Sequence, residues 1–174
     1  MQTIARKGKL VLKDGSVYEG ELYGKRNAVG EVVFTTGMSG YQETLTDPSF
    51  CGQIVVMTYP LVGNYGTNDL FNQGRKSFFQ GYVISELCDH PSNWRCEKTL
   101  EQFLDEQDVP VLTGVDTRAI TRKLRNYGVL QGVIVPAEMP QEEVEKLLAT
   151  PEVHDQVATV TTPEIYTLGN GKYH

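Results

Sequence analysis

The sequence predicts a mixed fold, with β-strands in its first half and helices interleaved with strands in its second half. Up to residue 85, apolar runs rich in valine and isoleucine alternate with stretches rich in glycine and asparagine. After residue 97, apolar residues recur at helical spacing, and short apolar runs lie between the helical segments. The 174 residues are enough for one domain with a real core, or for one domain and a tail.

The first elements are strands. KLVLKDGSVYEGEL predicts a β-hairpin over about residues 8–24, because Asp14-Gly15 accepts the positive φ angles of a type I′ turn. AVGEVVFTT (28–36) predicts a third strand and QIVVMTYP (53–60) a fourth. The unbroken apolar run in the fourth strand indicates burial on both of its faces.

Two glycine-rich stretches flank the fourth predicted strand. GMSGYQETLTDPSFCGQ (37–53) and LVGNYGTNDLFNQGRKS (61–77) are both expected to be loops. The second is long, and long loops in compact domains are often functional. FFQGYVIS (78–85) predicts a further strand.

The second half alternates between helices and strands. Helices are predicted over 97–107, 116–128 and 140–150, and strands over 109–115 and 129–136. Within the second helix, Asp116 is the expected N-cap and Gly128 the expected residue just beyond its C-terminus. Residues 1–150 are therefore assigned to one domain.

Residues 151–174 have poor apolar spacing, two prolines and a Gly-Asn-Gly sequence. They are expected to form a linker or extended arm.

Composition excludes several classes of protein. The net charge of −6 argues against a nucleic-acid-binding protein. No apolar run approaches the ~20 residues of a membrane helix, so no membrane contact is expected. The three cysteines, Cys51, Cys88 and Cys96, show no CxxC spacing, so neither a disulfide framework nor a metal site is expected, and a reducing cytoplasm fits best.

Cys51 is the first candidate for chemistry. A cysteine nucleophile needs a histidine base, and His90, His154 and His174 occur in no recognisable motif. Free cysteine is among the most buried residue types, so all three cysteines are expected to be structural. No complete catalytic set is found.

Ser49 is the second candidate. Asp47-Pro48 predicts either a turn or a helix start before it, and both place the hydroxyl near the surface, where it either contacts a ligand or only faces solvent. The basic helix with Arg118, Arg122, Lys123 and Arg125 is either a solvated face, an ion-pair network or a docking face for an acidic partner. Trp94 is expected to pack in the core or in an interface.

Several stretches together resemble one family. They are LVLKDGSVYEGELYG, AVGEVVFTTGMSGYQETLTDPSFCGQIVVMTYPLVGNYGTN, SELCDHPSNWR and TGVDTRAITRKLRNYG. The chain resembles the N-terminal domain of the small subunit of glutamine-hydrolysing carbamoyl-phosphate synthetase, strongly over residues 8 to about 135 and more weakly to the end.

The resemblance implies a swivelling β/β/α domain. In the family this domain precedes a class I glutamine amidotransferase domain, which carries the catalytic cysteine in a GxCxG-type elbow with a His/Glu pair. No such elbow occurs in the 174 residues. Residues 151–174 are therefore expected to lead to an amidotransferase domain that this chain lacks. By itself the chain is expected to be inactive and to contain no catalytic residue.

The resemblance also implies substrates and partners. The family enzyme is an ATP-dependent ligase that makes carbamoyl phosphate from glutamine and bicarbonate for arginine and pyrimidine biosynthesis. Its ATP and Mg sites lie on the large subunit, so no cofactor is expected here. Expected partners are the amidotransferase domain of the same subunit, the large subunit and glutamine. Ser49 matches the TDPS serine, the one family glutamine contact in this domain.

Two other functions remain open from the residues alone. The chain is either a free-standing protein-binding module that uses its basic helix, or a cysteine hydrolase that uses Cys51. The missing histidine context argues against the hydrolase.

Overall fold

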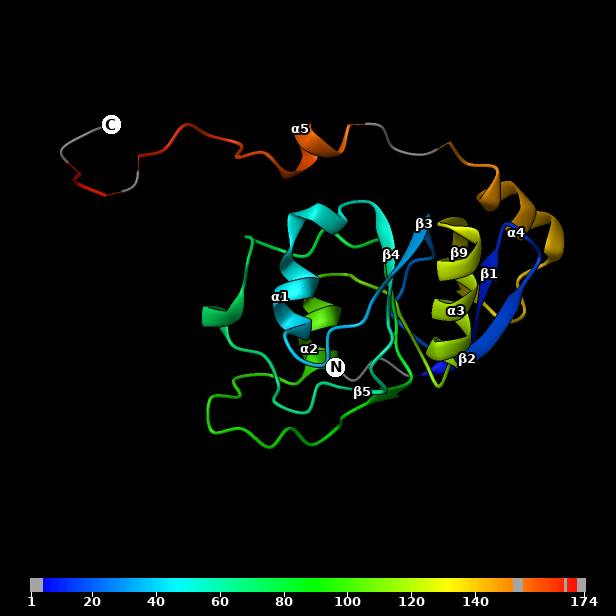
Figure 1. Ribbon diagram of the computed structural model, residues 1–174, viewed down its shortest axis with the longest axis horizontal. Helices are drawn as coiled ribbons and strands as arrows, with labels where there is room; N and C mark the ends of the chain where they lie inside the picture. Colours follow the sequence, from blue (N-terminus) through cyan, green and yellow to red (C-terminus); the bar gives the residue numbers. More distant parts are fainter. Residues whose placement is uncertain (1–4, 152–154, 168, 172–174) are drawn as a thin grey trace.

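Seven strands close into a barrel with helices packed around it (Figure 1). The computed structural model describes residues 5–151, 155–167 and 169–171. The barrel order is β1-β2-β8-β6-β4-β3-β9, and β9 pairs with β1 to complete the ring. Its strands are β1 (Arg6–Leu12), β2 (Val17–Tyr23), β3 (Ala28–Thr35), β4 (Gln53–Met57), β6 (Gly81–Val83), β8 (Val111–Thr113) and β9 (Leu130–Pro136).

The remaining elements lie in the connections. The short strands β5 (Leu61–Val62) and β7 (Glu86–Leu87) pair in a separate parallel sheet. The helices are α1 (Tyr41–Thr46), α2 (Leu100–Glu106), α3 (Thr117–Tyr127), α4 (Gln141–Leu148) and α5 (Gln156–Val160), with 3₁₀ turns η1 (Pro48–Phe50) and η2 (Asp69–Phe71). The strand-rich first half and the helix-containing second half confirm the predicted mixed α/β class.

The barrel interior is apolar. Every barrel strand contributes a side chain to one buried cluster, and Ile120 and Leu124 of α3 pack into it. On β4, Ile54 and Val56 belong to this cluster, whereas the intervening Val55 and the following Met57 belong to a second cluster with α1 and α2. The prediction that this strand is buried on both faces is therefore confirmed.

The hairpin forms, but its predicted turn type is wrong. Gly15 has a φ of 86°, whereas Asp14 is absent from the described non-glycine residues with positive φ. Gly15 N donates to Leu12 O at 2.9 Å, and Leu12 N donates to Ser16 O at 2.9 Å. This pattern is a three-residue connection with one left-handed glycine, which the right-handed strand twist also accepts.

The stretch 37–53, expected to be a loop, contains a helix. Tyr41, Gln42, Leu45 and Thr46 of α1 are buried, so one face of this short helix packs on the body. Gly40, the residue before the helix, has a φ of 76°. This glycine and the proline that follows the helix gave the stretch its loop-like composition. Tertiary burial outweighed local propensity here.

Other expectations concern length and exposure. The predicted strands over 53–60, 78–85 and 109–115 are shorter in the structure, at five, three and three residues.

Trp94 is 87% exposed, so the prediction that it packs in the core is wrong. The Arg95 guanidinium lies over its ring. Across the described residues, no helix is both long and apolar enough to cross a membrane.

Candidate functional site

Ser49 is presented on a turn that its neighbours hold rigidly. Asp47 ends α1 and caps η1, because its carboxylate accepts a hydrogen bond from Ser49 N at 2.8 Å. Pro48 follows at the first position of the turn, and Phe50 packs edge-on against the Phe79 ring with centroids 5.6 Å apart. Ser49 itself is exposed, as predicted, and the expected helix start is realised as a 3₁₀ turn.

Beside this turn, three polar side chains line up across the outside of the barrel. Glu31 on β3 is the register partner of Gln53 on β4 and of Gln131 on β9. Gln53 Nε2 donates to Glu31 Oε2 at 2.7 Å. Gln131 Oε1 is buried and accepts no hydrogen bond from the described residues. This polar row is flanked by apolar side chains that include Val29, Val33 and Val55. Its free acceptor can receive a donor from another molecule or segment.

The row forms the floor of a hollow, which we call the Ser49 hollow. Its volume is about 480 Å³, and residues from the segment after α4 form its far wall. The described residues that line it are Val29, Gly30, Glu31, Pro48, Ser49, Cys51, Gly52, Gln53, Gln80, Gln131, Thr150, Pro151 and Gln156. Hydroxyl and amide groups dominate its polar lining, and Glu31 is the sole charged residue of this described set.

The described lining offers no activated nucleophile. Cys51 is half-buried, not buried as expected, and Cys88 and Cys96 are also only half-buried. Burial raises the pKa of the Cys51 thiol, although Lys76 opposes the shift, and a raised pKa disfavours the reactive thiolate. His90 lies in an exposed segment away from this lining, and His154 and His174 lie outside the described residues.

The part of the chain that the structure describes contains no metal site either. No group of three or more His, Cys, Asp and Glu side chains there is placed to hold a metal ion. The hydroxyl and amide groups of the hollow are suited to hydrogen bonding of a polar ligand group.

The two glycine-rich stretches predicted to be loops bind each other. The rings of Tyr41 and Tyr65 are stacked with centroids 4.1 Å apart, and Tyr41 OH donates to Gly66 O at 2.6 Å. Tyr65 OH accepts from Gly40 N at 3.0 Å and from Tyr41 N at 3.1 Å, so it satisfies amides at the start of α1. Desolvation raises the pKa of both phenols, which keeps them neutral at ordinary pH.

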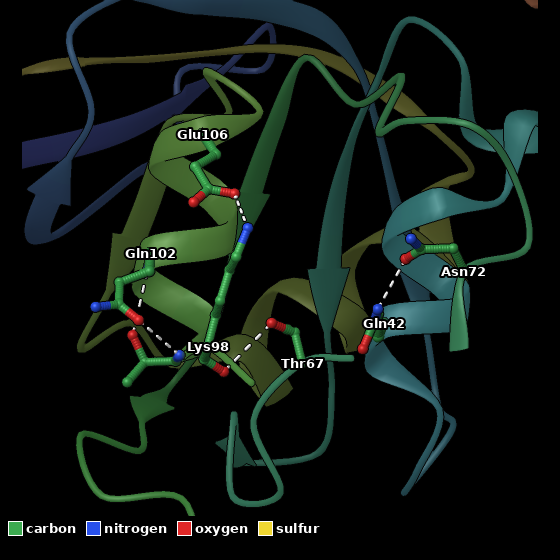
Figure 2. Close-up of polar contacts among 7 residues, drawn as sticks. Gln42, Thr67, Asn72, Lys98, Gln102 and Glu106 are labelled. Atoms are coloured by element: carbon green, nitrogen blue, oxygen red, sulfur yellow. Dashed lines mark hydrogen bonds and ion pairs between the residues drawn. The ribbon is translucent and has the colours of Figure 1, made fainter. Parts of the chain in front are cut away.

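Gln42 joins the same two stretches more deeply. It is fully buried, and its Nε2 donates to Asn68 O at 2.6 Å and to Asn72 Oδ1 at 2.7 Å. Its Oε1 accepts from Asn68 N at 2.9 Å. Figure 2 shows Gln42 extending from α1 toward Asn72 on the neighbouring loop. One side chain thus fixes the loop to the helix that precedes the Ser49 turn.

The same loop is tied on its other side to the start of α2. Thr67 Oγ1 donates to Lys98 O at 3.3 Å, and Lys98 Nζ lies 2.6 Å from Glu106 Oε2 (Figure 2). Thr99 and Gln102 form a capping box there, in which each side chain bonds the other's backbone. The spacing Thr-x-x-Gln before an apolar run was a readable signal for this boundary.

Sequence reasoning missed Tyr41, Gln42 and Arg75 as structural residues of the site. Tyr41, Gln42, Leu45 and Thr46 repeat at helical spacing, which was the available signal for a buried face. Nothing local identifies Arg75, whose partners lie 84 to 86 residues away.

The basic helix α3 divides into two sets of side chains. Lys123 forms an ion pair with Asp14 at 2.6 Å and also donates to Ser16 Oγ. For this residue, the ion-pair alternative given by the sequence is the one that the structure shows. Arg118, Arg122 and Arg125 are exposed, and none of the three has an acidic partner among the described residues. Asp116 caps the helix by accepting from Ala119 N at 2.9 Å, as predicted.

Comparison with known proteins points to one group. The family model described as carbamoyl-phosphate synthase small chain, CPSase domain, matches residues 10–134. The carbamoyl phosphate synthase small chain of Caldanaerobacter subterraneus subsp. tengcongensis is 54% identical over 140 residues, which cover 80% of this chain and 39% of that protein.

Two relatives have narrower names. The carbamoyl phosphate synthase pyrimidine-specific small chains of Halalkalibacterium halodurans and Bacillus subtilis are 47% and 46% identical over 169 residues. These alignments cover 95% of this chain, and 47% and 46% of the respective relatives. The chain thus spans less than half the length of these curated relatives.

Proposed function

Because the chain belongs to the carbamoyl-phosphate synthase small-chain family, we propose that it is the N-terminal, non-catalytic domain of such a small chain and borders its glutamine pocket. The whole enzyme would use ammonia released from glutamine to make carbamoyl phosphate in an ATP-dependent reaction in the cytoplasm. We also propose that this domain has the swivelling β/β/α fold of the family.

The observation that carries the proposal is the position of Ser49. It lies exposed on a turn fixed by Asp47 and Pro48, at the rim of a hollow whose described polar lining is mostly hydroxyl and amide groups, with Glu31 as its charged member. Glutamine has an α-ammonium, an α-carboxylate and an amide, and all need partners when they are enclosed. A serine hydroxyl both donates and accepts, so it can bind any of them.

Catalysis would come from outside these residues. Cys51 has a pKa shifted away from the thiolate, and the described lining of the hollow contains no histidine. The nucleophile of glutamine hydrolysis would therefore belong to an amidotransferase domain of the same subunit, docked over the Ser49 hollow. By itself, the 174-residue chain would not hydrolyse glutamine.

Ser49→Ala in the complete small chain, paired with its large chain, tests this role. Loss of one hydrogen bond of about 0.5–1.5 kcal/mol corresponds to a roughly twofold to twelvefold rise in KM for glutamine, and more if the bond is charge-assisted. Synthesis from free ammonia should be unchanged, because it bypasses the glutamine pocket.

Ser39→Ala is the matched control, since Ser39 is an exposed serine of the same stretch that does not line the hollow. Glutamine kinetics that stay at the wild-type level in Ser49→Ala would refute the pocket role.

We also propose that α3 contributes to docking with the large chain. Arg118, Arg122 and Arg125 form a row of unpaired cations on a chain of net charge −6. Tyr127 and Val129 add exposed apolar area beside it, at 76% and 56% exposure. Arginine and tyrosine are enriched at interfaces.

The combined change Arg118→Glu and Arg122→Glu should weaken subunit association in sedimentation or biosensor measurements, with the melting temperature preserved. Lys146→Glu on α4, another exposed cation, provides the charge-matched control. Unchanged association in the Arg118/Arg122 variant would remove α3 from the interface.

A further inference from the structure

Arg75 contacts the last turn of α5, which lies 84 to 86 residues further along the chain. Its guanidinium donates to three consecutive carbonyls there: NH1 to Thr161 O at 2.9 Å and Val160 O at 3.3 Å, and NH2 to Thr159 O at 3.1 Å. The last carbonyls of a helix have no partner within the helix and carry the negative end of its dipole. A planar fork of donors is suited to such a group, which a single ammonium is not.

Arg75 follows a stretch that packs against the C-terminal end of α1, just before the Ser49 turn. Gln73 N donates to Thr46 Oγ1 at 2.8 Å, and a Cβ at Gly74 would meet Thr46 O at 2.5 Å, so the chain passes α1 too closely for any other residue type. Thr46 is the last residue of α1 and is followed by the Asp47 cap of the Ser49 turn. The same helix end therefore positions both Ser49 and Arg75.

The segment that Arg75 holds crosses the Ser49 hollow. Gln156, the first residue of α5, lines the hollow together with Ser49, and its Cγ lies 4.0 Å from the place of a Cβ at Gly52. In Figure 1, α5 lies above α1 in the view and apart from α4. Arg75 and Gln156 thus bracket α5, one at each end.

Among the described residues, α5 is short and largely exposed. It has five residues and no buried side chain, and Val157 is 75% exposed. Isolated helices of this length are not stable in water. A long-range clamp on its C-terminal carbonyls therefore has a large share in keeping it formed and in place.

We propose that Arg75 is a positioning residue that clamps residues 155–161 across the Ser49 hollow. The clamp sets the direction in which the following chain leaves the domain, and so aligns whatever that chain carries with Ser49. This inference rests on the proposed glutamine role of Ser49, because alignment matters only if the hollow contributes to a binding site.

Amide hydrogen exchange in the 174-residue chain tests the clamp by itself. Thr159 N donates to Asp155 O and Thr161 N to Val157 O, so these amides report whether α5 is formed. Arg75→Met should make both exchange roughly threefold to tenfold faster, as expected for loss of charge-assisted but exposed hydrogen bonds.

Two further variants sharpen the test. Lys76→Met removes a neighbouring cation that, like Arg75, lies over the Phe78 ring, and it should leave exchange in α5 unchanged. Arg75→Lys keeps the charge but cannot bridge three carbonyls, so it should behave like Arg75→Met. Wild-type protection of these amides in Arg75→Lys would refute the clamp. The clamp would also be refuted if, in the wild-type chain, the amides of Thr159 and Thr161 exchanged as fast as those of an unstructured peptide.

Glutamine kinetics of the complete enzyme test the consequence. Arg75→Met should raise KM for glutamine severalfold while kcat and ammonia-dependent synthesis stay unchanged. If Ser49→Ala raises KM and Arg75→Met does not, the positioning role is refuted and the proposed function stands. If neither variant changes KM, both fail.

Discussion

Replacement of Gln42 by methionine should be among the most destabilising single changes in the stretch 37–53. Methionine has a similar length and no strong hydrogen-bonding group. It would leave the buried Asn68 N without its acceptor and the half-buried Asn72 Oδ1 without its donor, whereas Asn68 O would keep its bond from Phe71 N at 3.1 Å. Each buried polar group left unpaired costs about 1–3 kcal/mol.

The unpaired Asn68 N therefore accounts for about 1–3 kcal/mol, the lost bond to Asn68 O adds about 0.5–1.5 kcal/mol, and the apolar methionine recovers part of this through burial. We expect a net loss of about 1–3 kcal/mol in the free energy of unfolding. With a urea m-value of about 2 kcal/mol/M, the midpoint should fall by about 0.5–1.5 M. Circular dichroism is the suitable probe, because Trp94 is 87% exposed and reports little on packing.

Asn72→Ala is the matched comparison, because it deletes one half-buried partner of Gln42 and leaves Asn68 paired. Water can replace that bond, so the expected loss is below about 1 kcal/mol. Equal midpoints for Gln42→Met and Asn72→Ala would show that the buried Asn68 backbone does not depend on Gln42, and the reasoning would fail.

Two further predictions concern the hairpin and the loop. The hydrogen bond from Lys123 lowers the pKa of Asp14 to about 2, so its stabilising effect is present above pH ~4 and is lost as pH falls toward 2. Lys123→Met should therefore lower the free energy of unfolding slightly at pH 5 and almost not at all at pH 2, because the pair is partly exposed. An equal loss at both pH values would contradict this. Gly66 has a φ of 69° and a Cβ there would overlap Cys96 Sγ, so Gly66→Ala should lose more than about 2 kcal/mol in urea unfolding. Gly114→Ala, at a φ of 75° with open space, should lose only the backbone part of about 1 kcal/mol, and equal losses would rule out the clash.

Local patterns predicted most of the strands and helices. The apolar run Ile54 to Met57 identified a strand buried on both faces, and Asp116 identified a helix start, because both signals depend on neighbouring residues only. The closed barrel was not predicted. Closure depends on the pairing of β9 with both β1 and β3, and no local pattern specifies partners about 100 or more residues apart.

Of the residues that line the Ser49 hollow, the sequence singled out Ser49 and Cys51, and the glutamine contact of Ser49 stays a prediction. Ser49 followed from Asp47-Pro48 and from the resemblance, whereas the polar row beside it did not. Glu31 and Gln131 are separated by 100 positions and become neighbours only through the register of β3 and β9. The side chains of a strand's outer face are identified as a site only when the strand order is known.

The position of Ser49 depends on α1, because the Ser49 turn directly follows this helix. Along its whole length, α1 contacts the loop 65–73. Tyr41 contacts Tyr65 and Gly66, Gln42 contacts Asn68, and Thr46 accepts from Gln73 N. These contacts lie on one face of a helix of only six residues, which would not form alone. The two glycine-rich stretches are therefore one structural unit, and a change in either should move Ser49. In the complete enzyme, a variant at Gln42 that still folds should accordingly raise KM for glutamine although Gln42 does not line the hollow. A destabilised Gln42 variant with wild-type KM would show instead that Asp47 and Pro48 alone position the serine.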